Sequence, residues 1–163
     1  MKKLLTLIIS FAIFGIANAT DVSGTISSNT TWNLAGSPYI VTGNLTVAAT
    51  FTLTIDSGVE VKFDNGRSMS AYGHINATST TFTSNDGSPS PGKWNYLTFY
   101  SGTNSTFTNC TIEYGQYVNV DAGGNFTMTG GAIENMYSYG IYTAGTVNVF
   151  FSKITFFSRG VTP

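Results

Sequence analysis

Two glutamates stand 21 residues apart and form the best-placed pair for acid–base chemistry. Glu113 and Glu134 each follow an isoleucine, Ile112 and Ile133, by one position. If both isoleucines point into a core, the glutamates point outward from neighbouring strands, whose backbones lie about 5 Å apart. Such a pair can hydrolyse a glycoside with retention, because repulsion between the carboxylates keeps one protonated as the acid. The alternative is two solvated glutamates, with Lys153 available to pair with Glu134.

The other ionisable residues show no catalytic or metal-binding pattern. The remaining acids do not repeat at the 21-residue step, so they predict no carboxylate cluster for calcium-dependent lyase chemistry. His74 lies in a turn-like stretch, and the sequence holds no Gly-x-Ser-x-Gly motif. One histidine and one cysteine exclude an ordinary zinc site. We expect no metal and no cofactor, and we favour a protein that is not an enzyme, with the glutamate pair as the catalytic alternative.

Tyrosines gather in two neighbouring stretches of the second half of the chain. They are Tyr114, Tyr117, Tyr137, Tyr139 and Tyr142. Outward tyrosines on a rigid scaffold can stack on sugar rings through their apolar faces and leave their hydroxyls at the rim. The alternative is that the rings pack inside the fold or across its corners. The first interpretation predicts a carbohydrate-binding surface.

Threonine flanks an apolar residue in four triplets, at residues 52–54, 81–83, 106–108 and 127–129. With the middle residue inward, two outward columns are predicted, Thr106 with Thr127 and Thr108 with Thr129. The columns are about 7 Å apart along the strand, and neighbours in a column about 5 Å apart. A regular threonine array can order water and bind ice. The simpler interpretation is that threonine is favoured on exposed strands, and Asn148 and Phe150 interrupt the array.

The elements that position these residues are predicted from a repeat. Ile112, Ile133 and Ile154 are 21 residues apart, and no segment shows the apolar spacing of a helix. A fixed period in the twenties predicts a solenoid whose coils stack to bury their apolar faces. We expect parallel pairing between coils and a core that holds the lone Cys110 and the inward residues. Those inward residues are Phe107, Ile112, Val120, Met128, Ile133, Ile141, Val149 and Ile154.

The repeat lengthens toward the front of the chain. The central residues of the threonine triplets, Leu53, Phe82, Phe107 and Met128, are 29, 25 and 21 residues apart. The extra length must lie in turns, and residues 84–93 hold prolines and glycines that forbid a regular strand. Asn109 and Gly130 occupy equivalent turn positions that suit a left-handed backbone, where the next coil has Phe151. We expect about six coils.

The first residues predict export from the cell. Two lysines, an apolar run and a small-x-small site ending at Ala19 form a secretory signal peptide at residues 1–19. The following domains are an amino-terminal cap at residues 20–44 and a β-helix at residues 45–163. Without the two lysines of the signal, five basic residues remain against eight acidic ones, a net charge of −3. This balance argues against nucleic acid and anionic membranes as partners, and no second apolar run is long enough to span a membrane.

The stretch from Gly24 to Phe63 resembles the amino-terminal cap and first coils of secreted bacterial right-handed parallel β-helix repeat proteins, the pectin-lyase-like superfamily. The repeats from Thr106 onward are similar to the generic parallel β-helix repeat, with its polar turn, small residue and inward isoleucine. The resemblance implies a right-handed parallel β-helix; a β-sandwich is the alternative. The superfamily includes pectate lyases and polygalacturonases as well as surface proteins, and no catalytic residue carries over.

The leading hypothesis is a secreted or cell-surface module that binds extracellular polysaccharide or serves adhesion without catalysis. A polysaccharide lyase or hydrolase is the alternative, and ice binding a minor one. The last coil is the most apolar, with Val149, Phe150, Phe151, Ile154, Phe156 and Phe157. A solenoid needs a polar cap at each end. We therefore expect either a fragment of a longer β-helix or self-association through that coil.

Overall fold

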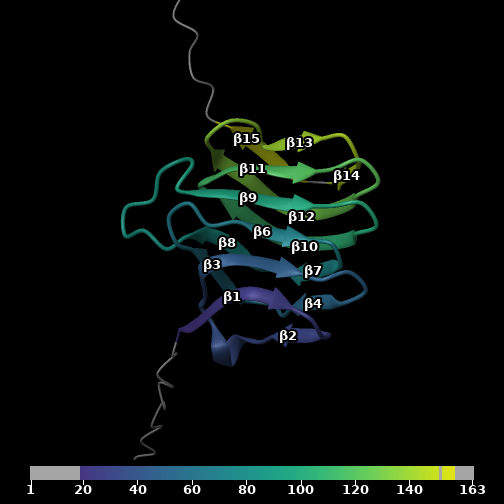
Figure 1. Ribbon diagram of the computed structural model, residues 1–163. Helices are drawn as coiled ribbons and strands as arrows, with labels where there is room; N and C mark the ends of the chain where they lie inside the picture. The colour runs from purple at the N-terminus through teal and green to yellow at the C-terminus, as the bar shows by residue number, and fades with distance from the viewer. Residues whose placement is uncertain (1–18, 151, 157–163) are drawn as a thin grey trace, which may run out of the picture.

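The computed structural model describes residues 19–150 and 152–156, whose strands wind into a parallel β-solenoid of about six coils (Figure 1). Every strand pair in the described chain is parallel, and all fifteen strands belong to one continuous sheet. A single 3-10 turn, η1 (Leu34–Gly36), is the only helical element among these residues. The prediction of an all-β solenoid is confirmed and the β-sandwich is excluded, whereas the right-handed sense stays a prediction. None of the described residues forms a helix able to cross a membrane.

Each coil contributes strands to three faces, which we name by their outward residues. The threonine face is built from β2 (Thr30–Trp32), β4 (Thr52–Ile55), β7 (His74–Thr78), the first part of β10 (Asn104–Glu113), the first part of β12 (Asn125–Met136) and β14 (Thr146–Phe150). The charged face is built from the first parts of β1 (Thr20–Ile26) and β3 (Tyr39–Val47), β5 (Glu60–Phe63), β8 (Thr81–Ser84), the second parts of β10 and β12, and β15 (Lys153–Phe156).

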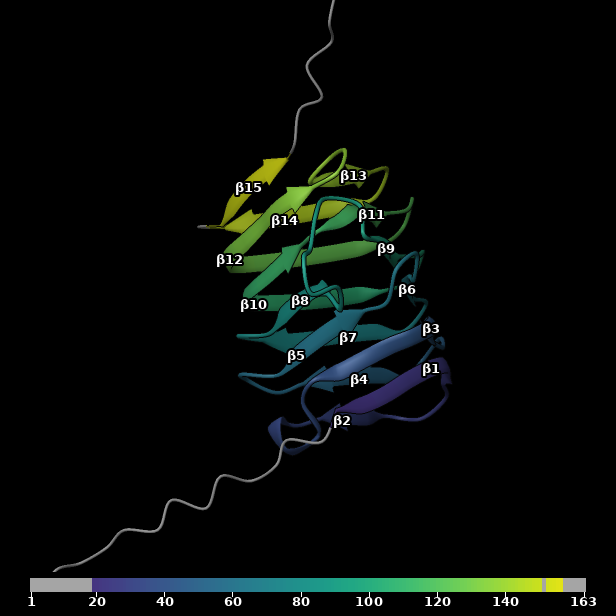
Figure 2. The ribbon, with the colours of Figure 1, turned by 90° about the vertical axis from the view of Figure 1, so that its left-hand side faces the viewer.

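The third face, the tyrosine face, completes each coil. It is built from the second parts of β1 and β3, β6 (Met69–Ala71), β9 (Trp94–Phe99), β11 (Gly115–Val120) and β13 (Ile141–Thr143). Figure 2 shows β10 and β12 bending from one face to the next within a single strand. Because β1 pairs with β3 in this stack, residues from Thr20 onward contribute strands to it, and the capping role of residues 20–44 stays a prediction.

The 21-residue repeat sets the register of the last coils. Ile112 pairs with Ile133, and Ile133 with Ile154, as the sequence predicts. The assignment of Phe82 to the same column as Leu53 and Phe107 is wrong, because Phe82 lies on the charged face and pairs with Ile112. The threonine triplet around it misled the assignment, since threonine is favoured outward on every face.

One long coil accounts for the uneven spacing, rather than a gradual lengthening. The step from Thr83 to its partner Glu113 is 30 residues, whereas the step from Asp64 to Asn85 is 21. The added residues form the loop 85–93 between β8 and β9, where the prolines and glycines predicted it (Figure 1). Its ends are fixed by backbone hydrogen bonds: Asn85 donates to Phe63 at 2.8 Å and Lys93 donates to Tyr114 at 2.9 Å. Lys93 also forms a 2.6 Å ion pair with Asp86.

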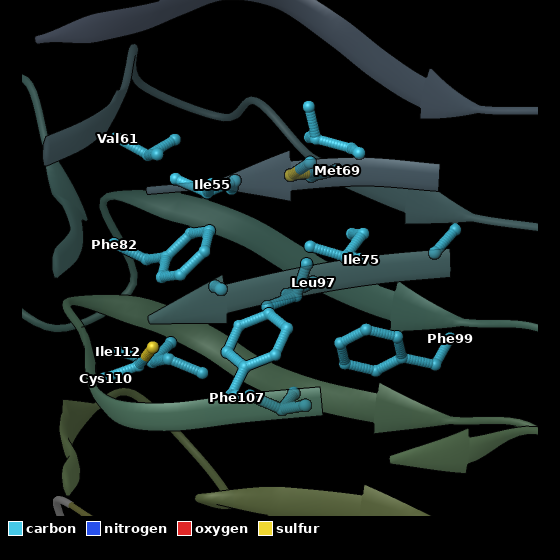
Figure 3. Packing of buried hydrophobic residues seen from close by; sticks show 14 of the residues in the cluster. Ile55, Val61, Met69, Ile75, Phe82, Leu97, Phe99, Phe107, Cys110 and Ile112 are labelled. Carbon is cyan, nitrogen blue, oxygen red and sulfur yellow. The ribbon is translucent and has the colours of Figure 1, made fainter. Parts of the chain in front are cut away.

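The core is a set of inward columns that run through the stack (Figure 3). Aromatic rings pack between coils, with centroids 5.1 Å apart for Phe82 and Phe107 and 4.7 Å apart for Phe99 and Phe126. Five of the eight predicted core residues are fully buried, namely Phe107, Ile112, Val120, Met128 and Ile133, and so is Cys110. Ile141 and Val149 are only half-buried and Ile154 is 40% exposed. Those three predictions are wrong because, in the described chain, no strand pairs with the outer side of β13, β14 or β15.

The left-handed turn positions are confirmed in the two coils that the structure describes. Asn109 has φ 53° and Gly130 has φ 71°. A Cβ added at the following Gly131, with φ 80°, would overlap the carbonyl oxygen of Cys110, so this turn requires glycine. Phe151, Phe157 and the signal segment 1–18 lie outside the described residues, as does the side chain of Phe156.

A chain of hydroxyl groups replaces one strand-to-strand hydrogen bond inside the core. Ser105 points inward with its side chain fully buried, and its Oγ accepts the backbone N–H of Ile75 at 2.9 Å. Thr103 Oγ1 donates its hydrogen to the carbonyl of Gly73 at 2.6 Å. Ser105 must therefore be the donor in the 2.9 Å contact between the two hydroxyls. The result is a fully satisfied relay from Ile75 to Gly73.

Candidate functional site

The two glutamates lie side by side on the charged face, as the sequence predicts. Glu113 and Glu134 are register partners on β10 and β12. Glu113 Oε1 accepts a 2.9 Å hydrogen bond from Thr83 Oγ1, and Glu134 Oε2 forms a 3.0 Å ion pair with Lys153. The two carboxylates are thus engaged by different neighbours. Among the described residues, no group of three or more histidine, cysteine or acidic side chains could hold a metal ion.

The single histidine and the single cysteine both have structural partners. His74 lies on β7 at the threonine face, and its Nδ1 accepts the backbone N–H of Asn104 at 2.9 Å. Cys110 is buried at the bend of β10, and its thiol donates to the carbonyl of Thr108 at 3.4 Å. Burial raises the pKa of the Cys110 thiol, which disfavours the reactive thiolate. Cys110 is therefore a buried core residue, as expected from the sequence.

Four tyrosines form a continuous row on the tyrosine face. Tyr96 and Tyr117 are register partners on β9 and β11, with ring centroids 4.8 Å apart. Tyr142 on β13 lies 5.9 Å from Tyr117, and Tyr139 in the preceding turn lies 6.2 Å from Tyr142. The exposed fractions are 37% for Tyr96, 56% for Tyr142 and 58% for Tyr139. We call Tyr96, Tyr117, Tyr139 and Tyr142 the tyrosine row.

Two of the predicted tyrosines lie away from the row. Tyr114 occupies the bend between β10 and β11 with φ 63°, and its carbonyl accepts the N–H of Lys93. Tyr137 follows β12 and lies against the loop 85–93, where a Cβ added at Gly92 would lie 3.1 Å from it. Both residues therefore border the long loop at the corner between the charged and tyrosine faces.

The sequence analysis missed Tyr96 and a second pair on the same face. Extending the 21-residue step backward from Tyr117 would have found Tyr96. Tyr72 and Tyr100 stack in parallel with centroids 4.3 Å apart and an angle of 1° between the rings. They follow β6 and β9 directly, after the 30-residue coil, where the period gives no guide. Burial, and then Tyr72, raise the pKa of Tyr100.

A column of small polar residues lies beside the tyrosine row. Thr46, Ser70, Thr98 and Asn119 are register partners on successive strands. Thr98 points outward, since both of its neighbours in β9 are in the core, yet only 7% of it is exposed. Tyr96 and Tyr100 stand two residues to either side of Thr98, on the same face of the strand. Burial raises the pKa of Tyr117, and Tyr96 raises it further, so this phenol stays protonated and able to donate at neutral pH.

The threonine columns are present as predicted and extend further than the triplets showed. Thr106 pairs with Thr127 and Thr108 pairs with Thr129 on β10 and β12. The first column continues through Thr31, Thr54, Asn76 and Asn148, and the second begins at Thr78. A third column on the same face comprises Thr52, His74, Asn104, Asn125 and Thr146. The outward positions of these strands hold no lysine, arginine or carboxylate, and Phe150 ends the second column.

Comparison with known proteins identifies no relative of this chain: no family model, no curated protein and no solved structure matches it significantly.

Proposed function

We propose that this chain is a non-catalytic module that binds extracellular polysaccharide through the tyrosine row. The observation that carries the proposal is four neighbouring tyrosines on successive coils, three of which are more than one third exposed. A tyrosine face offers apolar area to the C–H groups of a sugar and a hydroxyl to its rim. A solenoid strand holds each ring on a rigid backbone, so little conformational freedom is lost on binding.

Export supports the same proposal and forms part of it. The amino-terminal signal pattern and the low fraction of charged residues, 9%, are typical of an extracellular β protein. We propose that the protein is secreted or attached to the cell surface, and that it is a right-handed β-helix of the pectin-lyase-like type. Sugars on extracellular matrices and cell walls are then the chemistry that the tyrosine row meets.

The test is affinity electrophoresis of residues 20–163 in gels that contain a panel of neutral and acidic polysaccharides. Tyr117→Ala and Tyr142→Ala each remove one ring and should weaken binding by about 2- to 12-fold, equivalent to about 0.5–1.5 kcal/mol per aromatic contact. Tyr142→Phe keeps the ring and should retain most of the affinity. Leu34→Ala is the matched control, since Leu34 is an exposed apolar residue, 60% accessible, on η1 away from the row. Retardation that Tyr117→Ala leaves unchanged would contradict the proposal.

The competing enzymatic function is tested on the same samples. Hydrolysis or elimination would release new reducing ends or unsaturated products from the panel. Turnover that disappears in Glu134→Gln would replace the binding proposal with catalysis by Glu113 and Glu134. Binding without turnover would remove the enzyme from consideration.

Ice binding is a second candidate, favoured by the three uncharged columns of the threonine face. Hydroxyl and amide groups repeat there at about 4.8 Å between coils and about 7 Å along each strand. Thr127→Lys places a charged side chain in the middle of the face and should abolish any thermal hysteresis. The control is Thr25→Lys, which adds the same charge at an exposed position of β1 on the tyrosine face. Wild-type protein without thermal hysteresis would exclude this function.

A further inference from the structure

We infer that the tyrosine face binds a neutral, extended glycan chain that lies along the stacking axis of the solenoid, one sugar residue per coil. This inference rests on the proposed function and adds the charge and the direction of the ligand. It follows from two features of the face, the path of the tyrosine row and the repeat of its polar column.

The tyrosine row crosses the strands instead of following one of them. Tyr96, Tyr117 and Tyr142 come from β9, β11 and β13, which lie one above another in Figure 1. The ring-to-ring steps of 4.8 and 5.9 Å are comparable to the length of one sugar residue in an extended chain. A linear glycan therefore meets a new ring at each coil only if it runs along the axis. Tyr139 adds a fourth ring after a step of 6.2 Å.

The polar column beside the row repeats without charge. Thr46, Ser70, Thr98 and Asn119 present hydroxyl or amide groups on successive coils. Asn119 Nδ2 donates to Asp121 Oδ1 at 2.9 Å, which places a carboxylate at the border of the face. A uronic acid polymer carries one carboxylate per residue and needs a cation at each coil to offset its desolvation. The column offers none.

The cations of the described chain are used elsewhere. Lys62 pairs with Glu60 at 3.2 Å, and Lys153 pairs with Glu134 at 3.0 Å, both on the charged face. Lys93 pairs with Asp86 within the long loop. Arg67 precedes β6, and its carbonyl accepts the N–H of Asn95, so it stands near the row at one coil only. One guanidinium cannot match a charge that repeats with every sugar residue.

The first test compares polymers that share a backbone and differ in charge. The pairs are hydroxyethylcellulose with carboxymethylcellulose, and methyl-esterified with de-esterified polygalacturonan. The neutral member of a pair should retard the protein more, in a manner that depends on Tyr117 and changes little between 20 and 300 mM salt, a range over which exposed charges become screened. Tyr117-dependent binding that favours the acidic member, or falls steeply with salt, would overturn the inference and leave polysaccharide binding intact. Absence of retardation by any polymer would overturn the proposed function itself.

The second test separates an axial glycan from one that follows a strand. Tyr96 and Tyr100 lie four residues apart along β9 and its end, whereas Tyr142 lies two coils away from Tyr96. An axial chain predicts a 2- to 12-fold loss of affinity for Tyr142→Ala and little change for Tyr100→Ala. The reverse pattern would show a chain that follows the strand. Affinity for neutral oligosaccharides of two to six residues should rise with length and level off at four, and a plateau at two would contradict the proposed path. Circular dichroism spectra must match between variants.

Discussion

The buried hydroxyl relay gives a sharp prediction about stability. Ser105→Ala removes the acceptor of the Ile75 N–H and the donor to Thr103 Oγ1, and both groups are shielded from water. A buried donor left without a partner costs about 1–3 kcal/mol. The lost oxygen adds only a small cavity, so this desolvation cost is the main effect. For a chain of this size the melting temperature should fall by about 3–12 °C.

Urea denaturation followed by circular dichroism measures this cost, with Thr106→Ala as the matched control. Thr106 is the next residue of β10, and its hydroxyl also donates a 2.9 Å hydrogen bond, to Asn76 Oδ1, but on the exposed threonine face. Water can replace that bond, so Thr106→Ala should change the free energy of unfolding by less than about 0.5 kcal/mol. Ser105→Thr keeps a hydroxyl and should recover part of the loss. Equal effects of Ser105→Ala and Thr106→Ala would refute the assignment of Ser105 to a buried relay.

Three further predictions concern the core and the last coil. Ile133→Asp places an unpaired charge between Ile112 and Ile154 and should cost several kcal/mol, enough to unfold the domain; Ala132→Asp on the outward side is the control, and equal melting temperatures would contradict the inward column. Because burial raises the pKa of Cys110, its contribution to stability is complete below pH 9.0, the usual value, and declines as pH rises above it; Cys110→Ser should flatten this alkaline decline in urea titrations, and an identical pH profile would count against it. The exposed apolar side chains of Phe150 and Ile154 favour self-association, so the double substitution to serine should lower the sedimentation coefficient of any oligomer, whereas an unchanged distribution would exclude this surface as the contact.

The sequence predicted the stack where the coil length is constant and failed where it is not. From Phe107 onward each residue meets its equivalent 21 positions later, so Ile112, Ile133 and Ile154 could be aligned by counting. Phe82 was misplaced because a threonine triplet carries no information about which face it occupies. Ser105 in a core column was also unforeseen. Its partners are backbone groups of the previous coil, 30 residues away, and the long loop hides that register.

The same reasoning explains what was found of the tyrosine surface. Tyr117, Tyr139 and Tyr142 were predicted as outward residues and come together in the structure. Tyr114 and Tyr137 have similar sequence surroundings, but they fall on bends, and the direction of a side chain at a bend depends on turn geometry that spacing does not encode. The burial of Thr98 between flanking rings depends on side chains of three coils and has no local signal.

The long loop has a consequence for how such a chain tolerates change in length. Its two ends are held in the ladder by hydrogen bonds of Asn85 and Lys93 to neighbouring coils, so the residues between them do not set the register of β9. Doubling a flexible loop costs only about 0.6 kcal/mol of closure entropy. A foreign peptide inserted between Ser88 and Ser90 should therefore leave the stack intact. The loop is in effect a graft position at the edge of the tyrosine face, where a lineage or an engineer can alter what borders the row without rebuilding the scaffold.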